Sequence, residues 1–234
     1  MDFLCNSTLK AIELITSLDR EFISIVVLSL KVSLTAVIIG TFLGLAIAVG
    51  LYQMRFQYVR GIVLLLVNTS MGLPPVVVGL FLYLLFSRSG PLGALEILYT
   101  PTAMIIAQCI LATPIIAGIS HAAMVGAAPE IRFTALSLGA TGFQATKKVI
   151  KETRYSILAG IIAGLGRVTA EVGAVLIVGG NIAGYTRVMT TAIALEADKG
   201  DFVLAIALGI VLFCLSLVIN LFLYMLQSRG KGNG

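Results

Sequence analysis

The chain carries little charge. Asp, Glu, Lys and Arg together make up 12% of its 234 residues, whereas soluble globular domains average about 25%. Hydrophobic residues account for 59% of the sequence. This composition excludes a water-soluble globule and predicts a protein embedded in a membrane.

Residue patterns for catalysis and metal binding are also missing. The sequence contains one histidine, His121, and its three cysteines lack the spacing of a metal site. It contains no G-x-x-x-x-G-K-[ST] loop, the segment that holds the phosphates of ATP in P-loop enzymes. We therefore expect a chain that is not an enzyme and binds neither a cofactor nor a metal of its own, so that any ATP is consumed by a separate partner.

Long apolar stretches are abundant instead. A helix needs about 20 predominantly apolar residues to cross a bilayer, and the short alternating runs of a membrane barrel are absent from the sequence. The pattern predicts an all-α membrane protein with about five transmembrane helices, at residues 23–52, 62–86, 103–124, 157–178 and 202–226.

The predicted membrane domain covers residues 22–228. Residues 1–21 precede it, and there Leu9, Ile12 and Ile15 recur at helical spacing between charged residues. This pattern predicts an amphipathic helix that lies on the membrane surface or packs against its neighbours. A tail at residues 229–234 follows the domain.

Basic residues are concentrated on one side of the five spans. The connections on the side of the C-terminus hold nine basic and two acidic residues, whereas the opposite side holds five basic and eight acidic ones. Because Lys and Arg favour cytoplasmic loops, we expect a multi-pass protein of the inner or plasma membrane, with its N-terminus outside and its C-terminus in the cytoplasm. The same asymmetry accounts for the net charge of +5 without a nucleic-acid partner.

One polar, basic segment interrupts the apolar sequence at residues 129–154, and we call it the elbow. Pro129 suits the first turn of a helix, Gly139 permits a break, and Thr141 can cap a second helix. The elbow is therefore predicted to be two short helices hinged at Gly139 on the cytoplasmic side. Its apolar stripe and basic flanks would suit the groove of a soluble partner; an ordinary amphipathic loop is the alternative.

Three ionisable residues fall within the predicted spans: Lys31, Arg167 and Glu171. Charge in lipid is costly, so each is a candidate functional residue. Arg167 and Glu171 are four residues apart and are expected to pair on one helix face. Such a pair would either lock helix packing or shape the potential of an anion route. Lys31 could extend toward the outer interface.

The second predicted span contains its own helix break. Pro74 and Pro75 both lack a backbone donor, and the neutral donors Asn68, Thr69 and Ser70 come just before them. Irregular backbone at membrane depth is tolerated where protein or water covers it, and weak neutral sites allow an anion to pass. We expect this segment to line and gate a translocation path; a kink that only shapes packing is the alternative.

Residues 134–140 of the elbow, followed by Phe143 and Val149, resemble the coupling motif of ABC importer permeases. That motif consists of E-A-A, three residues, a Gly, nine residues, and then I-x-L-P. The sequence keeps Ala135 and Gly139 but has Phe133 in place of Glu and Lys-Glu in place of the final Leu-Pro. The resemblance implies a type I importer permease fold whose elbow is held by a cytoplasmic ATPase. The residues implied in this coupling are Phe133, Thr134, Ala135, Leu138, Gly139, Ala140, Phe143 and Val149.

Two further stretches narrow the resemblance. Residues 68–80 resemble the Pro-Pro-Val region of oxyanion permeases, and residues 171–187 resemble the same group. The segment that begins at Asn181, NIAGYTRVMTTAIALEADKGDF, is similar to the tungstate-type permease. The resemblance implies a tungstate pathway, with Asn181 beside it, served by ATPase subunits and an extracytoplasmic binding protein. Because five spans are few for a gated route, a homodimer is expected.

Three alternatives remain open at this stage. A molybdate or sulfate permease would have the same architecture. An ion-coupled secondary transporter would need coupling acids deep in the membrane, where only Glu171 qualifies, and the internal repeat common in such carriers is not evident. A membrane scaffold without transport activity would have no use for the broken second span.

Overall fold

The structure is a computed structural model that describes residues 2–17 and 19–231. Within these ranges the chain is helical and contains no strand, so the predicted all-α fold is confirmed. The helices are α1 (Asp2–Ser17), α2 (Arg20–Gln53), α3 (Gln57–Met71), α4 (Pro75–Phe86), α5 (Pro101–Ser137), α6 (Gly142–Glu152), α7 (Arg154–Thr169), α8 (Gly173–Gly179), α9 (Met189–Lys199) and α10 (Phe202–Lys231), with one short 3-10 turn at Gly93–Leu95.

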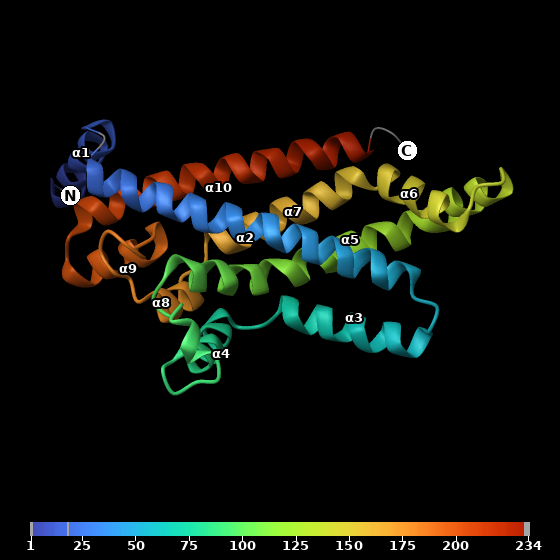
Figure 1. Ribbon diagram of the computed structural model, residues 1–234. Coiled ribbons are helices and arrows are strands. Elements are labelled where there is room, and N and C mark those ends of the chain that lie inside the picture. The colour runs from blue at the N-terminus through green and yellow to red at the C-terminus, as the bar shows by residue number, and fades with distance from the viewer. Residues whose placement is uncertain (1, 18, 232–234) are drawn as a thin grey trace.

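The long helices α2, α5, α7 and α10 run along one direction, and the elbow extends from one end of this bundle (Figure 1). Helix α5 is central, since it packs against α2, α3, α6, α7 and α8. Its Leu111 and Ile116 are buried in the main core together with Val32 of α2 and Val168 of α7. The short helices α8 and α9 lie at the same end of the bundle as α1, whereas α10 ends on the side of the elbow (Figure 1).

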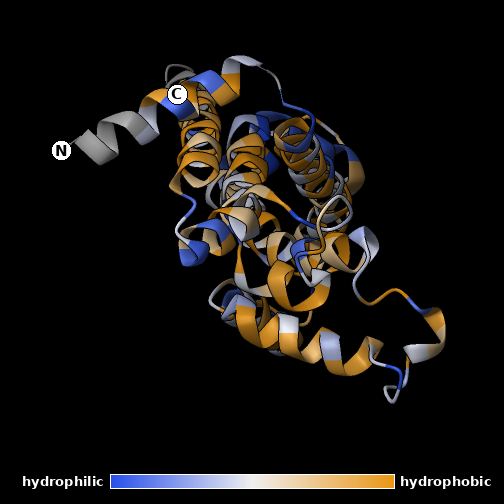
Figure 2. Ribbon diagram, turned by 90° about the vertical axis from the view of Figure 1, so that its left-hand side faces the viewer, coloured by the Kyte–Doolittle hydropathy of each residue, from blue (hydrophilic) through white to orange (hydrophobic). Residues whose placement is uncertain are grey.

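Among the described residues, three helices are long and apolar enough to cross a bilayer: Arg20–Gln53, the Pro101–Ala127 part of α5, and the Phe202–Met225 part of α10. Two bent pairs, α3 with α4 and α7 with α8, bring the number to five if each pair counts as one span. Figure 2 shows that hydrophobic residues dominate the long helices. Large apolar side chains such as Phe42 and Phe213 face outward, as lipid contact requires.

The N-terminal segment forms two helices rather than one. α1 ends at Ser17 and α2 begins at Arg20, where the Asp19 carboxylate accepts hydrogen bonds from the Glu21 and Phe22 N–H groups. In α1, Ala11 is buried in a cluster with residues of α2, α9 and α10, whereas Leu9 is exposed. The other predicted residues at these ends, Met1, Leu18 and 232–234, lie outside the described ranges.

The predicted helix start at Pro129 is wrong. Helix α5 continues through Pro114 and Pro129 to Ser137. Pro129 deprives the Val125 carbonyl of its helical donor, but Val125 is on an exposed part of the helix, where solvent can replace one lost hydrogen bond. The elbow is therefore the end of α5 followed by α6.

Glycine allows α4 and α8 to pack with little space between their backbones. A Cβ atom added at Gly79 would lie 2.8 Å from the Ala174 Cα and 3.2 Å from its carbonyl oxygen. Such a contact with backbone cannot be relieved by rotating a side chain. These two helices follow the two breaks in the chain, so this contact holds the broken segments together.

We expect Gly79→Ala to lower the free energy of unfolding by about 1–3 kcal/mol, the usual cost of overpacking. Gly209→Ala on α10 is the matched control, because nothing lies within 4 Å of its added Cβ and alanine favours a helix. Thermal unfolding of both variants in detergent measures the difference. Equal stability of the two variants would contradict the packing described for Gly79.

Candidate functional site

The elbow turns back on itself at Gly139. This residue adopts φ +83°, a left-handed conformation that glycine reaches without a steric penalty. The Gly139 N–H donates to the Leu136 carbonyl and the Ala140 N–H donates to the Ala135 carbonyl, both at 3.0 Å. These bonds satisfy carbonyls at the end of α5. The predicted break in the helix at Gly139 is confirmed.

Helix α6 begins with the cap that the sequence predicted. The Gln144 N–H donates to Thr141 Oγ1 (3.3 Å), and the Thr141 N–H donates to Gln144 Oε1 (2.8 Å). This reciprocal capping box satisfies two donors at the start of the helix. Val149 is fully buried, in a cluster with Ala48 of α2 and Met124 of α5. It anchors α6 to the bundle and does not itself lie on the exposed surface, and its role in coupling stays a prediction.

The elbow exposes large apolar side chains, although its sequence is polar and basic. Phe133, Leu138 and Phe143 have exposed fractions of 74%, 83% and 75%. Thr134 is exposed as well, whereas Ala135 and Ala140 are half-buried. Large apolar side chains gathered on one exposed feature mark an interaction surface. The other predicted coupling residues therefore lie at or beside a surface that a partner can reach, and their role in coupling stays a prediction.

Basic residues flank this surface. Lys147 and Lys151 are exposed on α6, and Lys148 Nζ lies 2.7 Å from Glu152 Oε1. The hydrogen bond from Lys148, followed by its positive charge, holds the pKa of Glu152 below its ordinary value. Glu152 is therefore ionised at neutral pH and offsets part of the positive charge at the end of α6.

The predicted break in the second span is confirmed. Helix α3 ends at Met71, α4 begins at Pro75, and their axes meet at 101°. Pro75 occupies the start of α4, where its missing N–H costs no helical bond. Pro74 is exposed and Pro75 is half-buried. The break is thus an open corner of the chain, and its role as a gate stays a prediction.

The polar residues before this corner face away from the core of the chain. Asn68 and Thr69 are exposed and Ser70 is half-buried, whereas Val67 is the buried residue of α3. The opposite side of α3 packs on α5, where Met71 contacts Gly118 closely enough that an added Cβ would lie 2.8 Å from its sulfur. The three predicted path residues therefore lie on a face that the chain itself does not cover.

The predicted pairing of Arg167 with Glu171 is wrong. Helix α7 ends at Thr169, and α8 begins at Gly173 at an angle of 59°. The helix ends between the two residues, so they do not share a helix face. No ion pair joins them in the described part of the chain. Arg167 is exposed in the last turn of α7, where the helix dipole favours a positive charge.

Glu171 is buried at this second break. Its Oε1 accepts the Ala174 N–H at 3.1 Å, and its backbone carbonyl accepts the Thr190 hydroxyl at 2.8 Å. The side chain therefore caps the first turn of α8, and the backbone is tied to α9. The arrangement stabilises the irregular backbone between α7 and α8 by satisfying groups that the broken helix leaves free.

We expect Glu171→Ala to destabilise the protein by about 1–2 kcal/mol, as loss of a helix cap does. Glu171→Gln should retain most of that stability because its amide oxygen can still accept the Ala174 N–H. Glu130→Ala, on the exposed elbow, is the control and should change stability by less than about 0.5 kcal/mol. Unfolding measured in detergent for all three variants tests this. Equal effects of Glu171→Ala and Glu130→Ala would refute the capping role.

Sequence reasoning missed a buried polar cluster that surrounds Glu171. Gln108 of α5 donates from Nε2 to the Val168 carbonyl at 3.1 Å, and Ser29 of α2 accepts the Met189 N–H at 2.7 Å. These groups line a cavity of about 10 Å³, bounded by Ser29, Leu30, Ser33, Gln108, Thr169, Glu171, Val188, Met189 and Thr190. The available signal was the single Gln within the apolar span 103–124. The cluster links α2, α5, α7 and α9 at the second break.

Asn181 lies at the end of the bundle opposite the elbow. It adopts φ +50° just after α8, a conformation that Asn tolerates better than most residues. Its Nδ2 donates to the Thr191 carbonyl at 3.3 Å. This contact joins the turn after α8 to α9, and a role for Asn181 in translocation stays a prediction.

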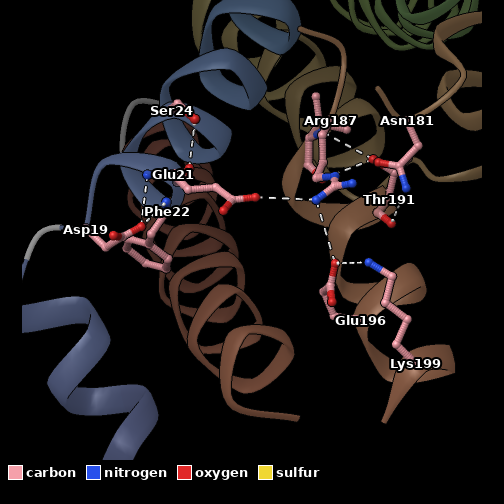
Figure 3. Close-up of polar contacts among 10 residues, drawn as sticks. Asp19, Glu21, Phe22, Ser24, Asn181, Arg187, Thr191, Glu196 and Lys199 are labelled. Atoms are coloured by element: carbon pink, nitrogen blue, oxygen red, sulfur yellow. Dashed lines mark hydrogen bonds and ion pairs between the residues drawn. The ribbon is translucent and has the colours of Figure 1, made fainter. Parts of the chain in front are cut away.

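A charged cluster beside Asn181 links the start of α2 to the segment around α9, which lies far away in the sequence (Figure 3). Arg187 Nη1 lies 3.4 Å from Glu21 Oε1 and 3.7 Å from Glu196 Oε1, and Lys199 Nζ lies 3.1 Å from the same Glu196 oxygen. Glu196 is buried, so its charge requires these partners. The cluster fixes α9 against the start of α2.

Metal-binding groups are not assembled in the described residues. Within 2–17 and 19–231, no three His, Cys, Asp or Glu side chains come together in a way that could hold a metal ion.

Comparison with known proteins relates this architecture to membrane transport. The family model of the binding-protein-dependent transport system inner membrane component matches residues 25–231. A probable anion ABC transporter permease protein of Haloferax volcanii is 41% identical over 215 residues, which are 90% of this chain and 92% of that protein. A tungstate uptake system permease protein of Peptoclostridium acidaminophilum is 38% identical over 231 residues, 98% and 100% of the two chains. A sulfate transport system permease protein of Salmonella typhimurium is 30% identical over 215 residues, 87% and 77%.

The fold is also similar to that in the crystal structure of an amino acid ABC transporter with histidines, with a TM-score of 0.68, 20% identity, and coverage of 92% of this chain and 96% of that one. The relatives are permease subunits, which do not hydrolyse ATP themselves, so the prediction of a transport subunit rather than an enzyme is confirmed. The chain belongs to the family of binding-protein-dependent transport system inner membrane components, the permeases of ABC importers.

Proposed function

We propose that this chain forms the membrane pathway of a tungstate importer. The observation that carries the proposal is the similarity to a tungstate uptake permease over 98% of the chain, together with the segment that begins at Asn181. A sulfate permease is also similar, at lower identity, so sulfate and molybdate are the alternative substrates. All three are tetrahedral dianions, for which a path of neutral hydrogen-bond donors is suited.

The proposed coupling surface is the exposed part of the elbow. Phe133, Leu138 and Phe143 would enter a groove of a cytoplasmic ATPase subunit, and the buried Val149 would transmit the movement to α2 and α5. This arrangement fits a helix-in-groove contact. ATP would be consumed by that subunit, with no cofactor bound by this chain, and an extracytoplasmic protein would deliver the anion.

The proposed path lies between two copies of this chain. Asn68 and Thr69 lie on a face of α3 that the chain leaves open, next to the corner at Pro74. A two-fold related copy would cover this face and place two sets of neutral donors opposite each other. The homodimer and the lining role of Asn68, Thr69 and Ser70 are parts of the same proposal.

The elbow end is proposed to face the cytoplasm. Arg55, Arg60 and Arg132 line one groove with residues of the elbow, and α6 carries further basic residues. Helix α10 ends on the same side (Figure 1). Basic residues favour the cytoplasmic side. The start of α1 and the charged cluster around Arg187 would then face outward, where the binding protein arrives.

Uptake into proteoliposomes tests the proposed function. Vesicles would contain this chain with its ATPase inside and its binding protein outside, and tungstate, molybdate and sulfate would be supplied separately. We expect ATP-dependent uptake that requires all three proteins and is fastest for tungstate. Uptake by this chain without an ATPase would instead support a secondary transporter, and faster uptake of sulfate or molybdate would overturn the choice of substrate.

A further inference from the structure

A groove of about 770 Å³ opens at the elbow end of the molecule. It lies between the end of α2, the start of α3, the last turns of α5 and the start of α6. Its walls are made by Tyr52, Gln53, Arg55, Arg60, Val125, Pro129, Arg132, Phe133, Leu136, Gly142, Phe143 and Thr146. The coupling surface described above accounts for its two phenylalanines but not for the rest of the groove.

All the charged residues that line this groove are basic. Arg55, Arg60 and Arg132 line it, and none of the lining residues is acidic. Arg60 and Arg132 are half-buried, and none of the three has a carboxylate partner among the side chains that the structure describes. Three arginines that line one groove without a counter-charge are suited to an anion.

One of these arginines lies over an aromatic ring. Arg132 Cζ lies 6.0 Å from the centroid of the Tyr52 ring, at the limit of a cation–π contact. Tyr52 comes from the end of α2 and Arg132 from α5, so the contact joins the two walls of the groove. The Tyr52 hydroxyl is buried and has no hydrogen-bond partner among the described residues.

The start of α3 adds positive potential at the same place. Phe56 precedes this 15-residue helix and provides no side-chain cap, and the first turn contains no acidic residue. The free N–H groups and the helix dipole therefore favour an anion there. Arg55 and Arg60 lie on either side of this helix start, so the dipole and the side-chain charges act together.

Apart from Gln53 and Thr146, the remaining walls of the groove are largely apolar, which points to an amphipathic ligand. Val125, Leu136 and the aromatic rings provide these walls, and Phe56 and Tyr58 are exposed by 77% and 83% on the adjoining turn. Exposed aromatic residues at a helix end mark the level of lipid headgroups. A small inorganic anion would use the arginines but not the apolar walls.

We propose that this groove binds the phosphate headgroup of an anionic phospholipid. The phosphate contacts Arg55, Arg60 and Arg132, and the glycerol and upper acyl chains lie against the apolar walls. Basic pockets between membrane helices bind such headgroups. The bound lipid would link the α2–α3 turn to the elbow. With the orientation proposed above, the lipid comes from the cytoplasmic leaflet.

Native mass spectrometry of the purified chain in a neutral detergent, titrated with dioleoyl phosphatidylglycerol, tests this site. The variant combines Arg55→Gln, Arg60→Gln and Arg132→Gln. Each basic residue near a membrane surface contributes about fivefold in affinity, so the triple variant should bind this lipid roughly 100-fold more weakly. The matched control combines Lys147→Gln, Lys148→Gln and Lys151→Gln, which remove the same charge from the elbow outside the groove, and it should bind like the unmodified chain. Arg132→Gln alone, with an expected loss of about fivefold, serves if the triple variant fails to fold.

Competition separates the possible sources of the anion. A large excess of inorganic phosphate or of tungstate should leave the bound phosphatidylglycerol in place, and phosphatidylcholine should bind more weakly than phosphatidylglycerol. The proposal is overturned if the arginine and lysine variants bind the lipid equally. It is also overturned if tungstate or phosphate displaces the lipid, which would make the groove a site for a soluble oxyanion, or if the purified ATPase displaces it, which would make the groove part of the coupling interface. These outcomes do not depend on which anion the transporter carries.

Discussion

Leu138→Asp combined with Phe143→Asp is expected to abolish association with the ATPase subunit while the membrane helices stay folded. Both side chains are mostly exposed, at 83% and 75%, so the folded chain loses little internal packing. Apolar and aromatic anchors at the centre of an interface contribute about 2 kcal/mol or more each. Loss of two such anchors corresponds to an affinity roughly 1,000-fold lower. Co-purification of the ATPase from detergent-solubilised membranes, with binding measured by titration, is the readout.

Tyr185→Asp is the control for this experiment. Tyr185 is a half-exposed aromatic residue at the opposite end of the bundle, so the same change of chemistry should leave ATPase binding unaltered. Far-ultraviolet circular dichroism and gel filtration establish that each variant is folded. ATPase binding that survives the double substitution in a folded protein would remove the exposed elbow from the coupling interface.

Asn68→Leu combined with Ser70→Ala is expected to reduce anion uptake strongly without loss of coupling. Hydrogen bonds to charged groups are worth about 1.5–3 kcal/mol, so each bond lost at the rate-limiting position lowers the rate by roughly 10- to 150-fold. Asn68 is exposed and Ser70 is half-buried, so little internal packing is disturbed. Uptake in proteoliposomes and stimulation of ATP hydrolysis by the loaded binding protein are measured together, and the stimulation should persist.

Asn220→Leu provides the matched control. Asn220 is exposed on α10 and donates within its own helix, to the Ser216 carbonyl at 2.8 Å, so this variant should transport at the normal rate. If Asn68→Leu with Ser70→Ala also transported normally, the segment before Pro74 would only shape helix packing, and the path would have to run elsewhere.

The features that the sequence predicted well depend on local chemistry. Gly139 predicts a turn because its backbone can adopt positive φ, and Thr141 predicts a helix cap because its hydroxyl can accept a backbone hydrogen bond. The structure contains both the turn and the cap. Pro74 and Pro75 likewise predict the break in the second span from local chemistry, because neither can donate a backbone hydrogen bond. Pro129 shows the limit of this reasoning, since a single proline near an exposed part of α5 is tolerated inside the helix.

The features that the sequence did not predict depend on contacts between distant segments. No proline marks the break between Thr169 and Gly173. That break is stabilised by the Glu171 side chain and by a hydroxyl from α9. Arg187 meets Glu21 across 166 positions of sequence, which no local pattern reveals. Val149 matches a coupling motif by spacing, yet the fold buries it completely.

Photo-crosslinking from position 138 tests the central claim, that the elbow is held by a separate ATP-hydrolysing protein, most directly. A photoreactive phenylalanine analogue would replace Leu138 in membrane vesicles prepared with the cytoplasmic face outward, and the same analogue at Tyr185 would be the control. We predict that position 138 captures a P-loop ATPase, that ATP changes the yield, and that position 185 does not capture it. Capture of an extracytoplasmic protein from position 138, or the same absence of any ATPase at both positions, would contradict the account.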